Sequence, residues 1–161
     1  MLDSGLYPVR KKALPLRQGK NYTARVGSNA TLRSTRAPLE LSNGVYIAVF
    51  YLPAALNIYV GKLGRFHFKK GVYFYMGSAQ RNLSARLKRH SSKKKSMRWH
   101  IDYFSSKSKM LGAITIPGPR KHECELAKQL GKMFEVPVPG FGASDCHCSG
   151  HLFYAPEVTW E

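Results

Sequence analysis

The chain has 161 residues, of which 43% are hydrophobic, which is enough for one core and short for two. No apolar run approaches the roughly 18 residues that span a bilayer, and the N-terminus lacks a signal-peptide core, so we expect a soluble cytoplasmic protein, nucleoid-associated in a prokaryote, with no membrane span. The formal charge of +17 exceeds what solubility requires. Nucleic acid is therefore the expected partner, with an anionic membrane surface as the second candidate.

Residues 1–42 form a basic segment in which Lys and Arg are scattered among Ser, Thr, Asn, Gly and Pro without a sustained period. This composition predicts a disordered arm that contacts phosphate groups. An organelle transit peptide is the alternative, because such peptides are also rich in Arg and poor in acids. We expect the folded domain over residues 43–156 and a short tail over 157–161.

The first half of the domain is rich in short strands. Val45–Leu52 is an apolar run with β-branched and aromatic residues, typical of a strand buried on both faces. Asn57–Gly61 and Phe66–Phe68 look like the arms of a hairpin with Gly64 at its turn, and Gly71–Gly77 forms a further strand. Short strands joined by tight turns predict a mostly antiparallel sheet.

The second half of the domain mixes helices with strands. We expect helices over Leu83–His90 and His122–Phe134, a helix that begins within Trp99–Phe104, and a strand over Met110–Ile116. Pro and Gly residues between 137 and 142 exclude regular structure there. The predicted fold class is therefore α+β, a small, mostly antiparallel sheet flanked by helices.

One face of the helix Leu83–His90 combines apolar and basic side chains. At about 100° per residue, Leu83, Arg86 and His90 lie within about 60° of one another. An arginine on a partly apolar face loses hydration unless an anion or a hydrogen-bond network compensates it, which indicates a phosphate site. The alternative is an arginine whose stem packs while its head reaches water.

Further basic residues surround this helix and continue into the loop that follows it. Such a run is a solvated surface by default, and we interpret it as a contact for a nucleic-acid backbone. The candidate contacts are Arg81, Lys88, Arg89, Lys93, Lys94, Lys95 and Arg98.

The two acids of the helix His122–Phe134 differ in their position around its axis. The apolar stripe of this helix is formed by Leu126, Ala127, Leu130, Met133 and Phe134. Glu123 lies in the middle of that stripe, whereas Glu125 lies about 200° away. An inward carboxylate needs a metal, an arginine or capping N–H groups, so Glu123 is either a ligand or an N-terminal cap.

The C-terminal segment holds two of the three cysteines. An odd number argues against a disulfide framework and fits a reducing compartment. Cys146, Cys148 and His151 have the residue types of a structural zinc site, although the C-x-C spacing is tight and the fourth ligand would be Cys124, His147 or a remote residue. The alternative is packing of small reduced cysteines under the sheet.

Three short motifs, in this order, resemble those of the GIY-YIG nuclease family. They are Gly44-Val45-Tyr46, then Tyr75-Met76-Gly77 before a helix with Arg86 and His90, and finally Glu123 on a later helix. The segment RWHIDYF and the tail GFGASDCHCSGHLFY, of DCxCxxHLFY type, look like those of a prokaryotic subgroup of this superfamily. With these segments the resemblance extends from Gly44 to Tyr154.

The resemblance implies hydrolysis of phosphodiester bonds with Mg²⁺ or Mn²⁺ as the cofactor. Tyr46, assisted by Tyr75, would activate the water, and Arg86 would hold the scissile phosphate. Glu123 would hold the metal ion. His90 would orient the water or the tyrosine, or serve as a structural hydrogen-bonding histidine.

The sequence departs from the family pattern in its spacing. The two tyrosine motifs lie farther apart than usual, and Tyr59-Val60-Gly61 occupies the usual distance. We assign the second motif to Tyr75-Met76-Gly77, because a helix follows it while a hairpin follows the other, so that the hairpin is an insertion. The family's asparagine after the glutamate helix has no clear counterpart, and residues 137–144 occupy its place.

Together these features predict a metal-dependent endonuclease that cuts branched or damaged DNA according to its structure and without sequence preference. The alternative is a nucleic-acid-binding module that keeps the fold without cutting. RNA cleavage also stays open, because no feature of the sequence reads a 2′-hydroxyl.

Overall fold

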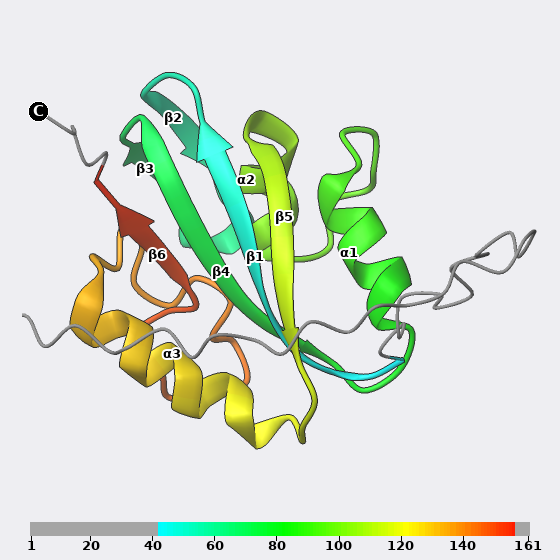
Figure 1. The fold of residues 1–161 in the computed structure, drawn as a ribbon. Helices are drawn as coiled ribbons and strands as arrows, with labels where there is room; N and C mark the ends of the chain where they lie inside the picture. Colours follow the sequence, from blue (N-terminus) through cyan, green and yellow to red (C-terminus); the bar gives the residue numbers. More distant parts are fainter. Residues whose placement is uncertain (1–41, 157–161) are drawn as a thin grey trace, which may run out of the picture. The chain divides into compact units, whose positions relative to one another are not determined.

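The computed structural model of the chain describes residues 42–156 (Figure 1). The predicted arm over residues 1–42 lies almost wholly outside the described residues, and so does the tail over 157–161. No helix in the described range is long and apolar enough to cross a membrane. The elements, in chain order, are β1 (Gly44–Leu52), β2 (Leu56–Tyr59), the 3-10 helix η1 (Gly61–Leu63), β3 (Arg65–Phe68), β4 (Gly71–Ala79), α1 (Leu83–Ser91), α2 (His100–Lys107), β5 (Lys109–Ile116), α3 (Lys121–Met133) and β6 (Leu152–Ala155).

Within residues 42–156, four strands form an antiparallel sheet in the order β5-β1-β4-β6, and β2 pairs with β3 in a separate hairpin. β1 pairs with β4 along its whole length, from Gly44 opposite Ala79 to Leu52 opposite Gly71. The hairpin is therefore inserted between two strands that are direct neighbours. The predicted α+β class, a small antiparallel sheet flanked by helices, is confirmed.

The side chains of the sheet alternate between two cores. Tyr46 and Phe50 are buried in the larger core, together with residues of α1, α2 and the hairpin. Met76 is buried in a smaller core with Ala127 of α3. Alternate residues of a strand point to opposite faces, so α1 and α2 cover one face and α3 covers the other (Figure 1).

Two features of the second half differ from the sequence prediction. The strand β6 is not predicted, because Leu152–Ala155 has four consecutive apolar residues and no alternation that marks a strand. Met133 is not part of the packed stripe of α3: it is the last residue of the helix and is 71% exposed. The other members of the stripe, Leu126, Ala127, Leu130 and Phe134, pack in the smaller core as predicted.

The shortness of β6 leaves one edge of β4 without a neighbouring strand. β6 pairs only with Val72–Tyr75, whereas β4 continues to Ala79. Beyond that pairing, the N–H of Met76 donates to the carbonyl of His151 at 2.9 Å, and the described sheet has no further strand on that side. Side chains from both faces of the sheet can meet at this open edge.

Candidate functional site

A polar cavity of about 520 Å³ lies at the open edge of β4. Among the residues that line it are Tyr75 from β4, Arg86 and His90 from α1, and Glu123 from α3. The helices α1 and α3 pack on opposite faces of the sheet, yet their polar side chains reach the same space. Four of the five candidate catalytic residues therefore share one cavity.

The fifth, Tyr46, lies directly behind the cavity wall. Its side chain is fully buried, and its hydroxyl is 2.7 Å from Nε2 of His90. The strand register places Tyr46 opposite Gly77, which lines the cavity, and a β-carbon on Gly77 would lie 2.5 Å from the Tyr46 hydroxyl oxygen. Glycine is needed at position 77 because the Tyr46 ring occupies the space of a side chain.

The pairing of β1 with β4 also decides between the two candidate positions of the second tyrosine motif. Tyr75 is buried in β4, and its ring centroid lies 6.4 Å from that of Tyr46. Tyr59 belongs to the inserted hairpin and is 60% exposed. The motif Tyr75-Met76-Gly77 is thus the one that neighbours β1.

Burial controls the protonation of the tyrosines and the histidine. It raises the pKa of both Tyr46 and Tyr75 above the ordinary value of a phenol, and the positive charge of Arg86 opposes the rise at Tyr46. Burial, with a smaller effect of the Lys95 charge, lowers the pKa of His90 to about 4. His90 is therefore a neutral imidazole at pH 7, and its contact with Tyr46 is a hydrogen bond between neutral groups.

Arg86 is held at the cavity by an aromatic contact. Its guanidinium carbon lies 4.7 Å from the centroid of the Trp99 ring, and that of Arg89 lies 4.9 Å from the same centroid. Arg89 also forms an ion pair with Asp102, whereas Arg86 and Trp99 both line the cavity. Of these two arginines, Arg86, the residue predicted to hold a phosphate, is therefore the one that faces the cavity.

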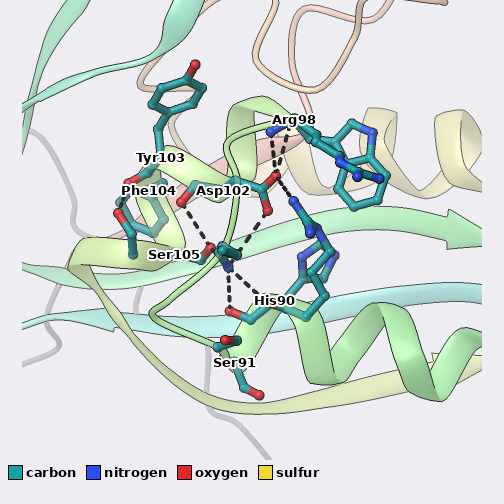
Figure 2. Close-up of polar contacts among 12 residues, drawn as sticks. His90, Ser91, Arg98, Asp102, Tyr103, Phe104 and Ser105 are labelled. Carbon is teal, nitrogen blue, oxygen red and sulfur yellow. Dashed lines mark hydrogen bonds and ion pairs between the residues drawn. The ribbon is translucent and has the colours of Figure 1, made fainter.

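The buried Asp102 anchors the loop between α1 and α2 (Figure 2). Its Oδ2 accepts a hydrogen bond from Nη2 of Arg89 at 2.8 Å and from the backbone N–H groups of Arg98 and Trp99 at 3.0 and 3.1 Å. Nζ of Lys95 lies 3.7 Å from Oδ1. This network holds the loop in place. The loop in turn places Arg98 and Trp99 in the wall of the cavity.

The basic residues predicted to contact nucleic acid fall into two groups. Lys95 has a side chain only 3% exposed and donates to Oγ of Ser105 at 2.7 Å, and Lys93 donates to the carbonyls of Ser105 and Ser108. Together with Arg89, these lysines hold the loop to α2 and differ from the solvated run that the sequence suggests. Lys93 is nevertheless exposed, and the other exposed members are Arg81, Lys88, Lys94 and Arg98.

Glu123 faces inward, as its helical position predicts. Its side chain is 14% exposed, against 64% for Glu125. Burial opposes its ionisation, but hydrogen bonds from His151 and Ser78 more than offset this effect and lower the pKa of the carboxyl. Glu123 lies in the first turn of α3, as the capping alternative expects, although the N-cap residue Arg120 forms no side-chain cap hydrogen bond. Glu123 is an ionised carboxylate at the cavity.

A cluster of potential metal ligands lies behind Glu123. Nδ1 of His151 is 2.9 Å from Oε1 of Glu123. The ligand atoms of the cluster all lie within 4.8 Å of one another. Its members are Cys124, Cys146, Cys148 and His151. The structure thus brings together the three candidate zinc ligands of the tail and one of the residues proposed as the fourth.

Sequence reasoning missed several residues of the cavity. Arg120 and Asp145 form an ion pair and both line it. His100, also at the cavity, accepts the backbone N–H of Gly142 at Nδ1, at 3.0 Å. The only sequence signal for these residues is that most of them fall within or beside the two longer segments, RWHIDYF and the cysteine-containing tail.

A family model described as a domain of unknown function, DUF123, matches residues 45–160. No curated protein and no solved structure matches the chain. The match runs from the second residue of β1 past the end of β6, and so includes every residue of the site described above. The chain therefore belongs to the DUF123 family.

Proposed function

We propose that this domain is a metal-dependent DNA endonuclease that hydrolyses phosphodiester bonds in branched or damaged DNA. The observation that carries the proposal is the convergence of polar side chains from three elements on one cavity beside the buried Tyr46. These side chains are Tyr75, Arg86, His90 and Glu123. They offer a cation for the phosphate, a ligand for a metal ion and a proton acceptor, which are the groups that such hydrolysis needs.

Arg86 is the phosphate ligand in this proposal. Its guanidinium carbon lies 4.7 Å from the centroid of the Trp99 ring, a cation–π contact that holds the group at the wall of the cavity. A guanidinium has five N–H donors, and two of them can donate parallel hydrogen bonds to the oxygens of one phosphate.

Glu123 is the metal ligand in this proposal. Its carboxylate is held in the ionised form and lines the cavity, which suits a hard divalent ion such as Mg²⁺ or Mn²⁺. Oε1 is engaged with His151, so we assign Oε2 to the ion. One protein carboxylate fits Mg²⁺, because this ion keeps several of its waters. When bound, the ion would neutralise charge on the phosphate and acidify its own waters.

Tyr46 and His90 handle the proton together in this proposal. The neutral His90 can accept the Tyr46 hydroxyl proton at Nε2, which leaves the phenol oxygen free to accept a hydrogen bond from the attacking water. The missing side chain at Gly77 keeps that oxygen next to the cavity. Burial makes a phenolate costly, so the charge of Arg86 has to favour any transfer of a proton from Tyr46.

The surface around the cavity fits a nucleic-acid backbone. Arg98 both lines the cavity and is exposed, and further exposed basic residues lie on α1 and in the loop after it. Contacts of this kind position a duplex by its phosphates and carry no sequence information. We therefore propose selection by DNA structure.

The complete burial of Tyr46 favours a second candidate function, a nucleic-acid-binding module that does not cut. A hydroxyl sealed from solvent and a phenol with a raised pKa are poor starting points for activating water. The two candidates differ in one outcome, because only the nuclease releases shorter strands.

A cleavage assay tests the proposal. The full chain is incubated with labelled duplex, single-stranded, flap and four-way DNA and with matching RNA, in Mg²⁺, Mn²⁺ or EDTA. We expect cutting of branched DNA that requires the metal, and a loss of at least about 100-fold in Arg86→Ala and Glu123→Gln. Binding of DNA should survive in both variants, because the exposed basic surface is unchanged.

Matched controls make the assay specific. Glu125→Gln removes a carboxylate from the exposed side of the same helix, and Arg65→Ala removes an exposed arginine from the hairpin. Both should cut as well as the unaltered protein. Equal activity in Glu123→Gln would refute the site, DNA binding without any cleavage would favour the binding module, and preferential cutting of RNA would change the substrate.

A further inference from the structure

Three cysteines and one histidine meet at the junction between α3 and the loop that precedes β6. Cys124 lies in the first half of α3, Cys146 and Cys148 lie in the loop, and His151 directly precedes β6. Their potential ligand atoms all lie within 4.8 Å of one another. Cys124 is more than 20 residues before the other three in the sequence, so the fold brings α3 to the loop to complete the cluster.

One pair of the cluster already has the spacing of a tetrahedral zinc site, and the 4.8 Å bound on the others means that the ligands need to close by no more than about 1 Å. With Zn–S near 2.3 Å and Zn–N near 2.1 Å, neighbouring ligand atoms of a tetrahedral site are about 3.5–3.8 Å apart. Sγ of Cys146 and Nε2 of His151 are 3.5 Å apart. Three thiolates and one imidazole are a set that zinc prefers, and four protein ligands close the site to substrate.

The tautomer of His151 supports the same interpretation. Nδ1 of His151 lies 2.9 Å from Oε1 of Glu123, within hydrogen-bond distance of a carboxylate oxygen. In the tautomer that donates from Nδ1 to this oxygen, the lone pair is on Nε2, the nitrogen 3.5 Å from Sγ of Cys146. An imidazole that donates to a carboxylate through one nitrogen and offers the other to an ion is the usual arrangement of a zinc-bound histidine.

We propose that Cys124, Cys146, Cys148 and His151 bind a structural zinc ion, and that His151 thereby holds the carboxylate of Glu123 in place. The ion joins α3 to a loop that has little regular structure and supplies Gly142, Ser144 and Asp145 to the cavity wall. His151 is a positioning residue for Glu123, and this second part alone rests on the proposed function.

Metal analysis of the full chain tests the zinc site. The protein is produced in zinc-supplemented medium and purified without chelators, and its zinc and iron contents are measured. We expect about one zinc per chain, and, after exchange with Co²⁺, the intense visible absorption of a tetrahedral thiolate site. Cys148→Ser should lose the zinc, whereas His147→Gln should keep it, because His147 is the exposed neighbour outside the cluster.

Four results would overturn the zinc assignment. They are a protein without stoichiometric metal, a disulfide between two of the cysteines, stoichiometric iron in place of zinc, and loss of zinc in His147→Gln. None of these readouts depends on cleavage, so the zinc site can fail while the nuclease stands, or stand while the nuclease fails.

The link to Glu123 is tested by NMR and by one substitution. Long-range ¹H–¹⁵N spectra of the zinc protein should show His151 protonated at Nδ1 and not at Nε2, and the reverse would refute the link. His151→Cys supplies a thiolate in place of Nε2 and removes the hydrogen bond to Glu123. We expect it to retain zinc but to need about 10–100-fold more Mn²⁺ for half-maximal cleavage. An unchanged Mn²⁺ requirement would contradict the positioning role.

Discussion

The hydroxyl of Tyr46 and Nε2 of His90 are joined by a buried hydrogen bond of 2.7 Å that ties β1 to the last turn of α1. Both side chains are essentially inaccessible to solvent, so water cannot replace either partner. Leaving a buried polar group without a hydrogen-bond partner lowers the free energy of unfolding by more than a typical hydrogen bond contributes to it. The bond therefore fixes the position of α1, and with it that of Arg86, as well as linking two candidate catalytic groups.

Replacing Tyr46 with phenylalanine should reduce both stability and activity. The change leaves Nε2 of His90 buried without its partner, at a cost of about 1–3 kcal/mol in the free energy of unfolding. It should also lower DNA cleavage by at least about 100-fold if Tyr46 handles the proton. Chemical denaturation and the cleavage assay measure the two effects.

Tyr73→Phe is the matched control for this substitution. Tyr73 is equally buried, and its hydroxyl donates to the carbonyl of Lys69 at 2.7 Å, in a part of β4 that does not line the cavity. It should lose stability and keep cleavage activity. If Tyr46→Phe also keeps its activity, Tyr46 is a structural residue only.

Gly77→Ala should be much more damaging than a glycine substitution at the other edge of the sheet, on β5. A β-carbon at position 77 would lie 2.5 Å from the ring and the hydroxyl of Tyr46, so the ring must move, at a cost of about 1–3 kcal/mol or more. Gly112 of β5 has no heavy atom within 4 Å of its β-carbon position, so Gly112→Ala should be close to neutral. Thermal unfolding of both variants measures the contrast, and equal stability would refute the packing argument.

Local patterns predicted most of the fold correctly because those patterns were strong. β1 and α1 follow directly from an apolar run and from the basic amphipathic segment after Gly77, and the inward side of Glu123 follows from helical geometry. These predictions need only periodicity and turn chemistry. The pairing of β1 with β4 was not predicted, although the interpretation of the hairpin as an insertion agrees with it.

Other features depend on contacts between distant parts of the chain, which periodicity does not encode. Lys94 and Lys95 are adjacent in one run of basic residues in the loop before α2. The side chain of Lys95 is nevertheless buried against α2, whereas Lys94 is exposed. Similarly, the 2.9 Å contact between His151 and Glu123 joins a tail residue to a helix. Only the three-dimensional packing decides which basic residue reaches solvent and which histidine meets the carboxylate.

Removing the charge of Asp102 should destabilise the loop between α1 and α2. Asp102 is fully buried, and Asp102→Asn leaves Arg89 and Lys95 without their anion, at a cost of about 3–5 kcal/mol. Asp145→Asn, which breaks an exposed ion pair with Arg120, should cost less than about 1 kcal/mol. Denaturant unfolding of the two variants compares them, and equal costs would contradict the importance of burial.

The Asp102 carboxylate should also make the stability of the protein depend on pH in the acidic range. Burial opposes ionisation of Asp102, but its hydrogen bonds with Arg89 and with the backbone of Arg98 and Trp99 lower its pKa in the folded state. Its contribution is therefore complete above the unfolded-state pKa of about 4 and is lost as the pH falls through the folded-state value. The unaltered protein should lose more stability than Asp102→Asn on acidification below about pH 4. Parallel curves for the two proteins would rule this contribution out.

His90 should produce a separate pH dependence at higher pH. Its folded-state pKa is about 4, whereas the unfolded chain titrates near 6.5, so between these values the unfolded state binds more protons. The contribution is complete above about pH 6.5 and is lost as the pH falls to about 4, by up to about 3 kcal/mol. His90→Gln should flatten the stability curve in this window, whereas His67→Gln, on the exposed hairpin, should leave it unchanged. NMR titration of the His90 ring provides the direct measurement, and a midpoint near 6.5 in the folded protein would show that burial does not hold this imidazole neutral.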